Sequence, residues 1–327
     1  MKKHRNLLCS ILFLTILVGL LAVASRLVVP KNNEKASGMH NARATGFLTE
    51  RENSMDYVVI GDSETYSSMS PMRLWRDYGY TGYICGTPSQ HLEDTLGYLQ
   101  QFCENQKPKL VIFEANALYR SSGFQDDFYR VVYRNVEKVF PIFEYHNRWK
   151  ELSFRDIGKV NYTWRNYLKG FLPTFVSKPW EGGNSYMKKT PDLREIPKVN
   201  RYYFGKIAEF CKDNNLPLLI TNVPNPVNWR YAKHNSVQLL ADKYGLEYFD
   251  MNLHLEEINI DWKKDSRDGG DHMNLYGAAK VTDFLGKYMA EHYSLPDHRG
   301  DEAYSSWDKD LEKYEKQIEK SLPDEEN

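Results

Sequence analysis

The sequence predicts an α/β fold, a three-layer α/β/α sandwich around a central parallel sheet. Short apolar runs rich in β-forming residues alternate with longer segments of helical periodicity, the pattern of a parallel sheet covered on both faces. The expected strands are 57–60, 83–85, 110–113, 218–221 and, more weakly, 246–249, and the expected helices are 91–103, 199–211, 234–244 and 275–292.

The N-terminus predicts a membrane anchor. Lys2, Lys3 and Arg5 precede an uncharged apolar run that extends from Leu7 to Ser25 and is long enough to cross a bilayer. Basic residues before the span predict a cytoplasmic stub within 1–29 and an extracytoplasmic domain held at the cell membrane. Ala22-Val23-Ala24 also fits a cleavage site, so a removed signal peptide is the alternative.

Composition shifts predict the boundaries that follow the anchor. Residues 30–54 are polar and are expected to form a linker, the α/β domain is expected over 55–296, and the acidic segment 297–327 is expected to be a helix and tail. The apolar stripe of that helix, Trp307, Leu311, Tyr314, Ile318 and Leu322, favours docking over association.

One connection between strands is much too long for a simple crossover. The excess, about 119–197, is expected to be an insertion in which aromatic and basic residues are interleaved. Its aromatics could stack sugar rings, contact the membrane surface or dock a partner. They could equally form the small core of a subdomain.

Composition excludes several functions. The formal net charge of -1 offers no basic excess for a nucleic-acid partner. The four cysteines have no paired spacing, and no histidine pair or acidic loop has metal-ligand spacing, so neither a metal nor a cofactor is expected.

Two short motifs far apart in the chain predict acyl chemistry. Gly61-Asp62-Ser63 directly follows the first strand, and Asp271-His272-Met273-Asn274 opens the last helix of the domain. A serine on a strand-to-loop turn becomes nucleophilic when a histidine removes its proton. The neighbouring residues also have plain structural roles. Asp62 can cap the turn and Asn274 can cap the helix. Gln90 can either bind substrate or, as its structural role, begin a helix.

These blocks resemble those of membrane-anchored SGNH (GDSL-type) hydrolase-like proteins. The first two blocks lie within 57–90, through Gly86-Thr87-Pro88-Ser89-Gln90, and the last runs from Asp271 to Ala278. The resemblance implies an SGNH/flavodoxin-like fold, with Ser63 as nucleophile and His272 as general base. It also implies oxyanion donors at Gly86 and Asn116.

The chain departs from the family pattern in two places. The triad carboxylate usually precedes the histidine by two or three residues, where this chain has glycines, so Asp271 is preferred and Asp268 is the alternative. Glu114 stands where the third block usually has glycine, as a hydrogen-bond partner or a strand-end charge.

The resemblance is close to extracytoplasmic partners of membrane-bound O-acyltransferases, which act in polysaccharide acetylation and teichoic-acid D-alanylation. It implies serine-dependent O-acyl transfer, mainly of acetyl groups, to a cell-surface glycan or teichoic-acid-like polymer, or ester hydrolysis on such a polymer. A polytopic membrane acyltransferase is the implied partner. The alternative is a non-catalytic scaffold that keeps the fold and binds a membrane acyltransferase or a polysaccharide-export complex.

Overall fold

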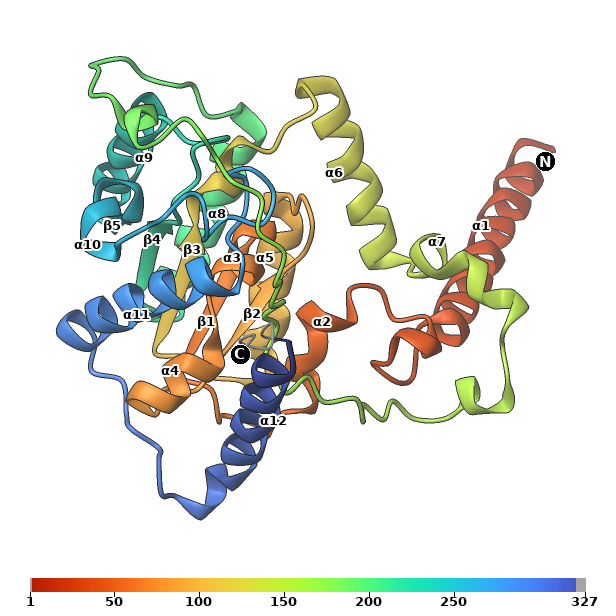
Figure 1. Cartoon of the computed structure of the whole chain (residues 1–327). Coiled ribbons are helices and arrows are strands. Elements are labelled where there is room, and N and C mark those ends of the chain that lie inside the picture. Colours follow the sequence, from red (N-terminus) through yellow and green to blue (C-terminus); the bar gives the residue numbers. More distant parts are fainter. Residues whose placement is uncertain (1, 322–327) are drawn as a thin grey trace. The chain divides into compact units, whose positions relative to one another are not determined.

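A computed structural model describes residues 2–321 of the chain (Figure 1). The chain divides into two compact units. The helical unit consists of residues up to 42 together with 122–164, and the sheet unit consists of 43–121 together with residues from 165 onward. Leu322 and the rest of the expected acidic tail lie outside the described residues.

The sheet unit contains the expected parallel sheet. Its strands are β1 (Tyr57–Gly61), β2 (Gly82–Gly86), β3 (Leu110–Glu114), β4 (Leu218–Asn222) and β5 (Glu247–Asp250), in the order β2-β1-β3-β4-β5. All four pairings are parallel. The chain adds β2 on one side of β1 and then β3 on the other side, so the strand order switches between β1 and β3. Open α/β sheets place their sites at the carboxyl ends of the strands at such a switch point.

Helices cover both faces of this sheet, which confirms the predicted fold class. α5 (Leu92–Asn105) packs against α8 (Lys198–Asp213), and α11 (Leu275–His292) packs against α3 (Ser63–Ser68) and α4 (Pro71–Tyr78). α9 (Tyr231–Tyr244) packs on β5, and the short α10 (Leu255–Ile258) contacts α11.

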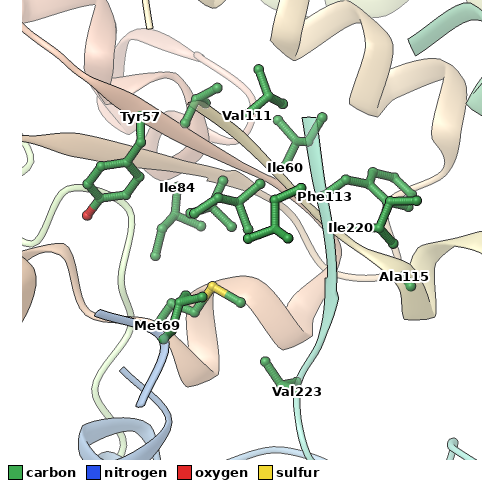
Figure 2. Packing of buried hydrophobic residues seen from close by; sticks show 14 of the residues in the cluster. Tyr57, Ile60, Met69, Ile84, Val111, Phe113, Ala115, Ile220 and Val223 are labelled. Carbon is green, nitrogen blue, oxygen red and sulfur yellow. The ribbon is translucent and has the colours of Figure 1, made fainter. Parts of the chain in front are cut away.

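The strands are almost wholly apolar because they are buried from both sides. Every residue of β1, β2, β3 and β4 is buried, while the edge strand β5 begins with an exposed Glu247. Figure 2 shows Ile60, Phe113 and Ile220 of three neighbouring strands packed together. Burial of such side chains is the main term that stabilises a sheet of this kind.

The segment expected to be a linker is not uniform. It contains short 3₁₀ turns at Lys35–Ser37 and Gly46–Thr49 and the helical turn α2 (Ala42–Thr45). Phe47 is fully buried, with ring centroids 5.8 Å from Tyr83 and 5.0 Å from Phe102. The part from Arg43 onward therefore belongs to the sheet unit, and Phe47 belongs to its core.

The long insertion is also divided. Residues 122–164 lie in the helical unit, whereas 165–197, which we call the strap, lie in the sheet unit. Lys169 of the strap is fully buried between Glu50 and Asp310, at 2.6 and 2.7 Å. Asp310 lies on α12 (Ser305–Ser321), whose Trp307 and Tyr314 are buried, so this helix docks along its apolar stripe.

The helical unit contains α1 (Lys2–Val28), α6 (Phe124–Val139) and α7 (Ile142–Tyr145), with 3₁₀ turns at His146–Lys150 and Phe154–Ile157. Over Lys3–Val28, α1 is long and apolar enough to cross a membrane, with a hydropathy of 2.8. A signal sequence shares these properties. α7 packs against α1.

Candidate active site

The serine of the first motif stands at the junction of β1 and α3. Gly61 has a φ of +154°, and a Cβ there would lie 2.8 Å from the Thr65 side chain and 2.9 Å from Glu114 Cβ, so only glycine fits the turn. Asp62 caps α3 by accepting a hydrogen bond from the Glu64 N–H at 3.1 Å. Ser63 is therefore the first residue of the helix, at the carboxyl edge of the sheet.

The structure brings His272 to this serine. His272 Nε2 lies 2.8 Å from Ser63 Oγ, within hydrogen-bond distance. The His272 side chain is 11% exposed, and Ser63 is 6% exposed. A histidine nitrogen at this distance can accept the serine proton as the hydroxyl attacks a carbonyl carbon.

The carboxylate on the other ring nitrogen is Asp268, not the preferred Asp271. Asp268 Oδ2 lies 2.7 Å from His272 Nδ1, and Asp268 Oδ1 accepts the His272 backbone N–H at 2.8 Å. Asp271 Oδ2 is 3.5 Å from Nδ1. Asp271 instead directs Oδ1 at the Asn228 and Asn225 side-chain amides.

The electrostatics of Asp268 fit this position. Burial alone would raise its pKa, but hydrogen bonds from the His272 ring and backbone, with a further one from Arg267, lower the pKa of Asp268 to about 2. The carboxylate is therefore ionised at neutral pH. It can hold the imidazole in one tautomer and stabilise the imidazolium that forms when Ser63 loses its proton.

The loop that carries these residues explains why spacing misled the sequence interpretation. Gly269 and Gly270 have φ angles of +81° and +93°, which turn the chain back on itself. An antiparallel bridge joins Ser266 to Met273, and the Gly270 N–H donates to Ser266 Oγ at 2.6 Å. In this tight loop the carboxylate of Asp268, four residues before the histidine, lies closer to the His272 ring than the carboxylate of Asp271, which directly precedes the histidine.

The strap orders the same loop. The Lys178 N–H donates to the Ser266 carbonyl at 2.9 Å, and the Gly269 N–H donates to the Lys178 carbonyl at 3.1 Å. The Trp180 N–H donates to Trp262. Part of the insertion therefore supports the histidine loop directly.

The expected oxyanion donors lie at the same sheet edge. Gly86 is paired with Gly61 at the ends of β2 and β1, and a Cβ on Gly86 would lie 2.1 Å from Thr65 Oγ1. Asn116 is buried in the 3₁₀ turn that follows β3, the strand on the other side of β1. Their role toward an oxyanion stays a prediction.

Two accessory residues have structural partners. The Gln90 side chain accepts from Thr87 Oγ1 at 2.9 Å and donates to Thr95 Oγ1 at 3.0 Å, which ties together the loop before α5. Asn274 caps α11 by accepting from the Tyr276 and Gly277 N–H groups at 3.0 and 3.2 Å. These contacts favour the plainer roles for both.

Three buried acidic residues form a cluster beside the serine, and of these the sequence interpretation named Asp62 and Glu114 but missed Glu64. Asp62 pairs with Arg120 at 2.6 Å. Glu114 accepts from Asn222 Nδ2 at 2.9 Å, and burial together with the Asp62 charge raises the pKa of Glu114 to about 8. Glu64 is fully buried, and burial followed by the charges of Asp62, Glu114 and Asp271 raises its pKa well above its ordinary value.

Asn225 connects this cluster to the histidine loop. Its Nδ2 donates to Glu64 Oε1 at 2.5 Å and to the Asp271 carbonyl at 2.8 Å. Asn225 follows β4, so its place after a predicted strand was the available signal. No comparable signal marks Glu64, because a glutamate is rarely buried without an ionic partner.

The described residues include one group of metal-ligating type. Glu64, Asp271 and His272 can place one ligand atom each within 4.8 Å of the others. A metal would need a His272 nitrogen, and these are hydrogen-bonded to Asp268 and Ser63. The geometry favours a serine–histidine–aspartate arrangement over a metal centre.

A cavity of about 1170 Å³ lies far from this chemistry. Its lining includes Leu218 and Glu247, the first residues of β4 and β5, at the sheet edge opposite the one that carries Ser63. We therefore locate the candidate site from the convergent side chains and not from the size of a cavity.

The chain resembles solved structures at 12% and 13% sequence identity. No family model and no curated protein matches its sequence. Solved structures that resemble it include a lipase/acylhydrolase from Enterococcus faecalis, with TM-score 0.39, 12% identity, and 74% of this chain and 98% of that chain covered. A GDSL-like lipase from Bacteroides thetaiotaomicron gives TM-score 0.36 and 13% identity, with 76% and 98% covered.

Proposed function

We propose that the chain is a serine-dependent acyl-transfer enzyme of the SGNH type that acts on esters at the outer surface of the cell membrane. The observation that supports this proposal is the relay from Ser63 Oγ through His272 to Asp268, at 2.8 and 2.7 Å. Three groups with these roles in series can activate a serine at neutral pH.

The proposed reaction has two halves. Ser63 Oγ attacks the carbonyl carbon of an acyl donor while its proton moves to His272 Nε2. The tetrahedral oxyanion forms, and it is stabilised by backbone N–H groups of Ser63 and Gly86 and by the Asn116 side-chain amide. The bond to the leaving alcohol then breaks, the alcohol takes the proton from His272, and an acyl-Ser63 ester remains.

In the second half an acceptor hydroxyl loses its proton to His272 and attacks the acyl-Ser63 carbonyl. Collapse of the second tetrahedral intermediate returns the proton to Ser63. If the acceptor is a hydroxyl of a surface glycan or teichoic-acid-like polymer, the product is an O-acylated polymer. If the acceptor is water, the reaction is ester hydrolysis.

The apolar α1 supports a transferase over an esterase, because an enzyme tethered beside the membrane can receive acyl groups from a polytopic membrane acyltransferase. We propose acetyl as the acyl group and place the sheet unit outside the cytoplasm. The non-catalytic alternative drew its support from the irregular carboxylate spacing and from Glu114 in the third block. The first of these supports weakens, because Asp268 lies 2.7 Å from His272 Nδ1.

Labelling with a fluorophosphonate probe tests the proposal, since the probe reacts with activated serines. We expect the wild type to be labelled, and Ser63→Ala and His272→Ala to lose labelling. Ser67→Ala is a matched control, because Ser67 lies buried on the same helix as Ser63. An unlabelled, well-folded wild type, or labelling that survives in Ser63→Ala, would contradict the proposal.

The polymer substrate is tested in cells. We expect a strain that carries only Ser63→Ala to lose O-acetyl groups from its envelope polymers, while Ser67→Ala retains them. Loss of labelling without any change in polymer acetylation would leave the serine chemistry standing and reject the polymer as the acceptor.

A further inference from the structure

Helix α6 of the helical unit is amphipathic in the reverse sense of an ordinary surface helix. Its exposed side chains include large apolar residues, whereas its buried residues are both acidic, Asp127 and Glu137. The exposed apolar set is Phe124, Phe128, Tyr129, Val132, Tyr133, Val136 and Val139, with exposed fractions from 39% to 68%. A soluble protein normally turns such a face toward its core.

Two ion pairs form along the polar side of α6. Arg130 pairs with Asp127 at 2.9 Å, and Arg134 pairs with Glu137 at 2.9 Å. Since the buried acids have cationic partners, this orientation leaves no bare charge inside the protein. The apolar side of α6 is the side that faces the surroundings.

The chain after α6 fastens it to the end of α1. The Ile142 N–H at the start of α7 donates to Ser25 Oγ of α1 at 3.2 Å. The Arg148 guanidinium donates to the carbonyl of Val28, the last residue of α1, and also pairs with Asp156 at 2.7 Å. Figure 1 shows α1 and α6 diverging from α7.

Further exposed apolar side chains lie in the turns that pack on the same end of α1. Trp149 is 64% exposed, Phe154 94% and Ile157 69%. α1 contacts both turns that carry them. Tryptophan and other aromatic residues are enriched where a membrane-spanning helix leaves the hydrocarbon.

We propose that the apolar face of α6, together with Trp149 and Phe154, lies in the outer interface of the bilayer beside α1. The occupant of this face is lipid, because the face belongs to the same unit as the one helix of the described residues that is long and apolar enough to span a membrane. The chain would then hold the membrane at two places, and the second would fix the orientation of the helical unit.

The charge of α6 sets the kind of membrane that it accepts. Asp126, Asp127 and Glu137 balance Arg130, Arg134 and Lys138. The helix is therefore neutral overall, so attraction to anionic lipid contributes little and apolar burial drives the contact. Binding to zwitterionic lipid follows, with little dependence on salt.

A fluorescent probe on the full chain, reconstituted in phosphatidylcholine vesicles, tests this inference. One environment-sensitive fluorophore is attached at Val132→Cys on the apolar face or, as matched control, at Lys138→Cys, which is exposed and lies one turn from Arg134 on the polar side of the same helix. Both variants also carry Cys9→Ser and Cys103→Ser, which leaves only the buried Cys85 and Cys211. Quenching is compared between doxyl-labelled lipid and aqueous iodide.

We expect the Val132 probe to shift its emission to shorter wavelength, to be quenched by doxyl lipid and to be at least several-fold less sensitive to iodide than the Lys138 probe. Equal quenching of both probes by iodide would overturn the inference. Protection of Val132 from both quenchers would also overturn it, since protein and not lipid would then cover the face.

The inference rests on the proposed membrane span of α1, and a third probe separates the two. With Cys103→Ser alone, the fluorophore is attached at the native Cys9, inside the apolar segment. Doxyl quenching at Cys9 but not at Val132 would reject the α6 contact alone. Loss of doxyl quenching at both positions would reject the membrane span as well.

Discussion

His272 contacts both the nucleophile and the carboxylate of the candidate site. One nitrogen meets Ser63 Oγ and the other meets Asp268 Oδ2, and the Asp268 pKa is held at about 2 mainly because the hydrogen bonds from His272 outweigh the cost of burial. An aspartate that stays ionised throughout the working pH range can act on the imidazole without itself exchanging protons.

Asp268→Asn tests which carboxylate orients the histidine. We expect kcat for ester hydrolysis to fall about 10²- to 10⁴-fold, because an amide can favour the wrong imidazole tautomer and cannot stabilise the imidazolium. Asp271→Asn is the matched control and is expected to change kcat by less than about tenfold. A larger loss in Asp271→Asn than in Asp268→Asn would return Asp271 to the orienting role.

Glu64→Gln tests the neutral state of the buried glutamate. The pKa of Glu64 is higher in the folded protein than its unfolded value of about 4.3. The folded wild type therefore keeps a proton on Glu64 that the unfolded chain releases. The stability that the protonated Glu64 contributes is lost as pH rises above the unfolded value. Glutamine is neutral at every pH. We therefore expect the free energy of unfolding of Glu64→Gln, relative to that of the wild type, to rise as pH increases above about 5, by up to about 1.4 kcal/mol per pH unit, and the Tm difference to rise with it.

Thermal unfolding of both proteins across this range measures the effect. Gln also retains an acceptor for the Asn225 amide and places its own amide where Glu64 Oε2 has no hydrogen-bond partner among the described residues. A Tm difference that is independent of pH, or that falls as pH rises, would show that Glu64 is ionised in the folded protein.

The sequence identified Ser63 and His272 because each belongs to a local motif. It could not identify Asp268 as the orienting carboxylate, because the choice between two nearby aspartates depends on the loop conformation and not on spacing. Glu64, Arg120 and Asn225 were missed for a related reason. They come together from the ends of three different strands, and contacts of that kind leave no periodicity in the sequence.

Among the elements, the loop of residues 266–273 decides the position of His272. Its two glycines both have positive φ, but only one is enclosed. A Cβ on Gly270 would lie 2.7 Å from Pro226 Cγ and 3.2 Å from Trp180, whereas a Cβ on Gly269 would have no atom closer than 3.8 Å. Substitutions at Gly269 and Gly270 therefore distinguish the effect of backbone strain from the effect of a collision with surrounding side chains.

Gly270→Ala is expected to lower kcat more than Gly269→Ala does. Both variants carry the cost of a left-handed alanine, about 1–2 kcal/mol, but only Gly270→Ala must also displace Pro226 or Trp180 and with them the histidine loop. Steady-state ester hydrolysis and thermal unfolding of both variants are the measurement. Equal losses of kcat would mean that the strain, and not the packing of the loop against the strap, controls the site.

The main elements of the sheet unit were predicted within a few residues, because buried parallel strands and amphipathic helices have strong periodic signals. The helices α3 and α4 were not predicted, since they are too short for a clear period. The insertion was expected as one body and is divided at about residue 165. Which part of an irregular segment joins which unit is set by tertiary contacts such as the buried Lys169, and polar composition gave no indication that Lys169 is buried.

For the whole molecule, the proposed arrangement is an enzyme that is anchored by α1 and has its site outside the cytoplasm. Basic residues before the apolar segment of α1 predict that the N-terminus stays inside. A periplasmic-type phosphatase reporter fused after Asn327 is expected to be active, and a fluorescent protein that folds only in the cytoplasm is expected to be dark. The reverse pattern would contradict the orientation.

The same fusions distinguish an anchor from a cleaved signal. A retained α1 predicts that the fusion remains in the membrane pellet after alkaline carbonate extraction, at the mass of the full chain. Release of a shorter soluble product would indicate cleavage after the apolar segment instead.

The central claim is that Ser63 is an acyl-accepting nucleophile activated by His272 and Asp268. Peptide mass spectrometry after brief reaction with an activated acyl ester, quenched in acid, tests it most directly. We predict one acyl group on the peptide that contains Ser63, slow to accumulate in His272→Ala and Asp268→Asn and absent in Ser63→Ala. Acylation that is absent from Ser63 in the folded wild type, or equally fast in His272→Ala, would contradict the claim.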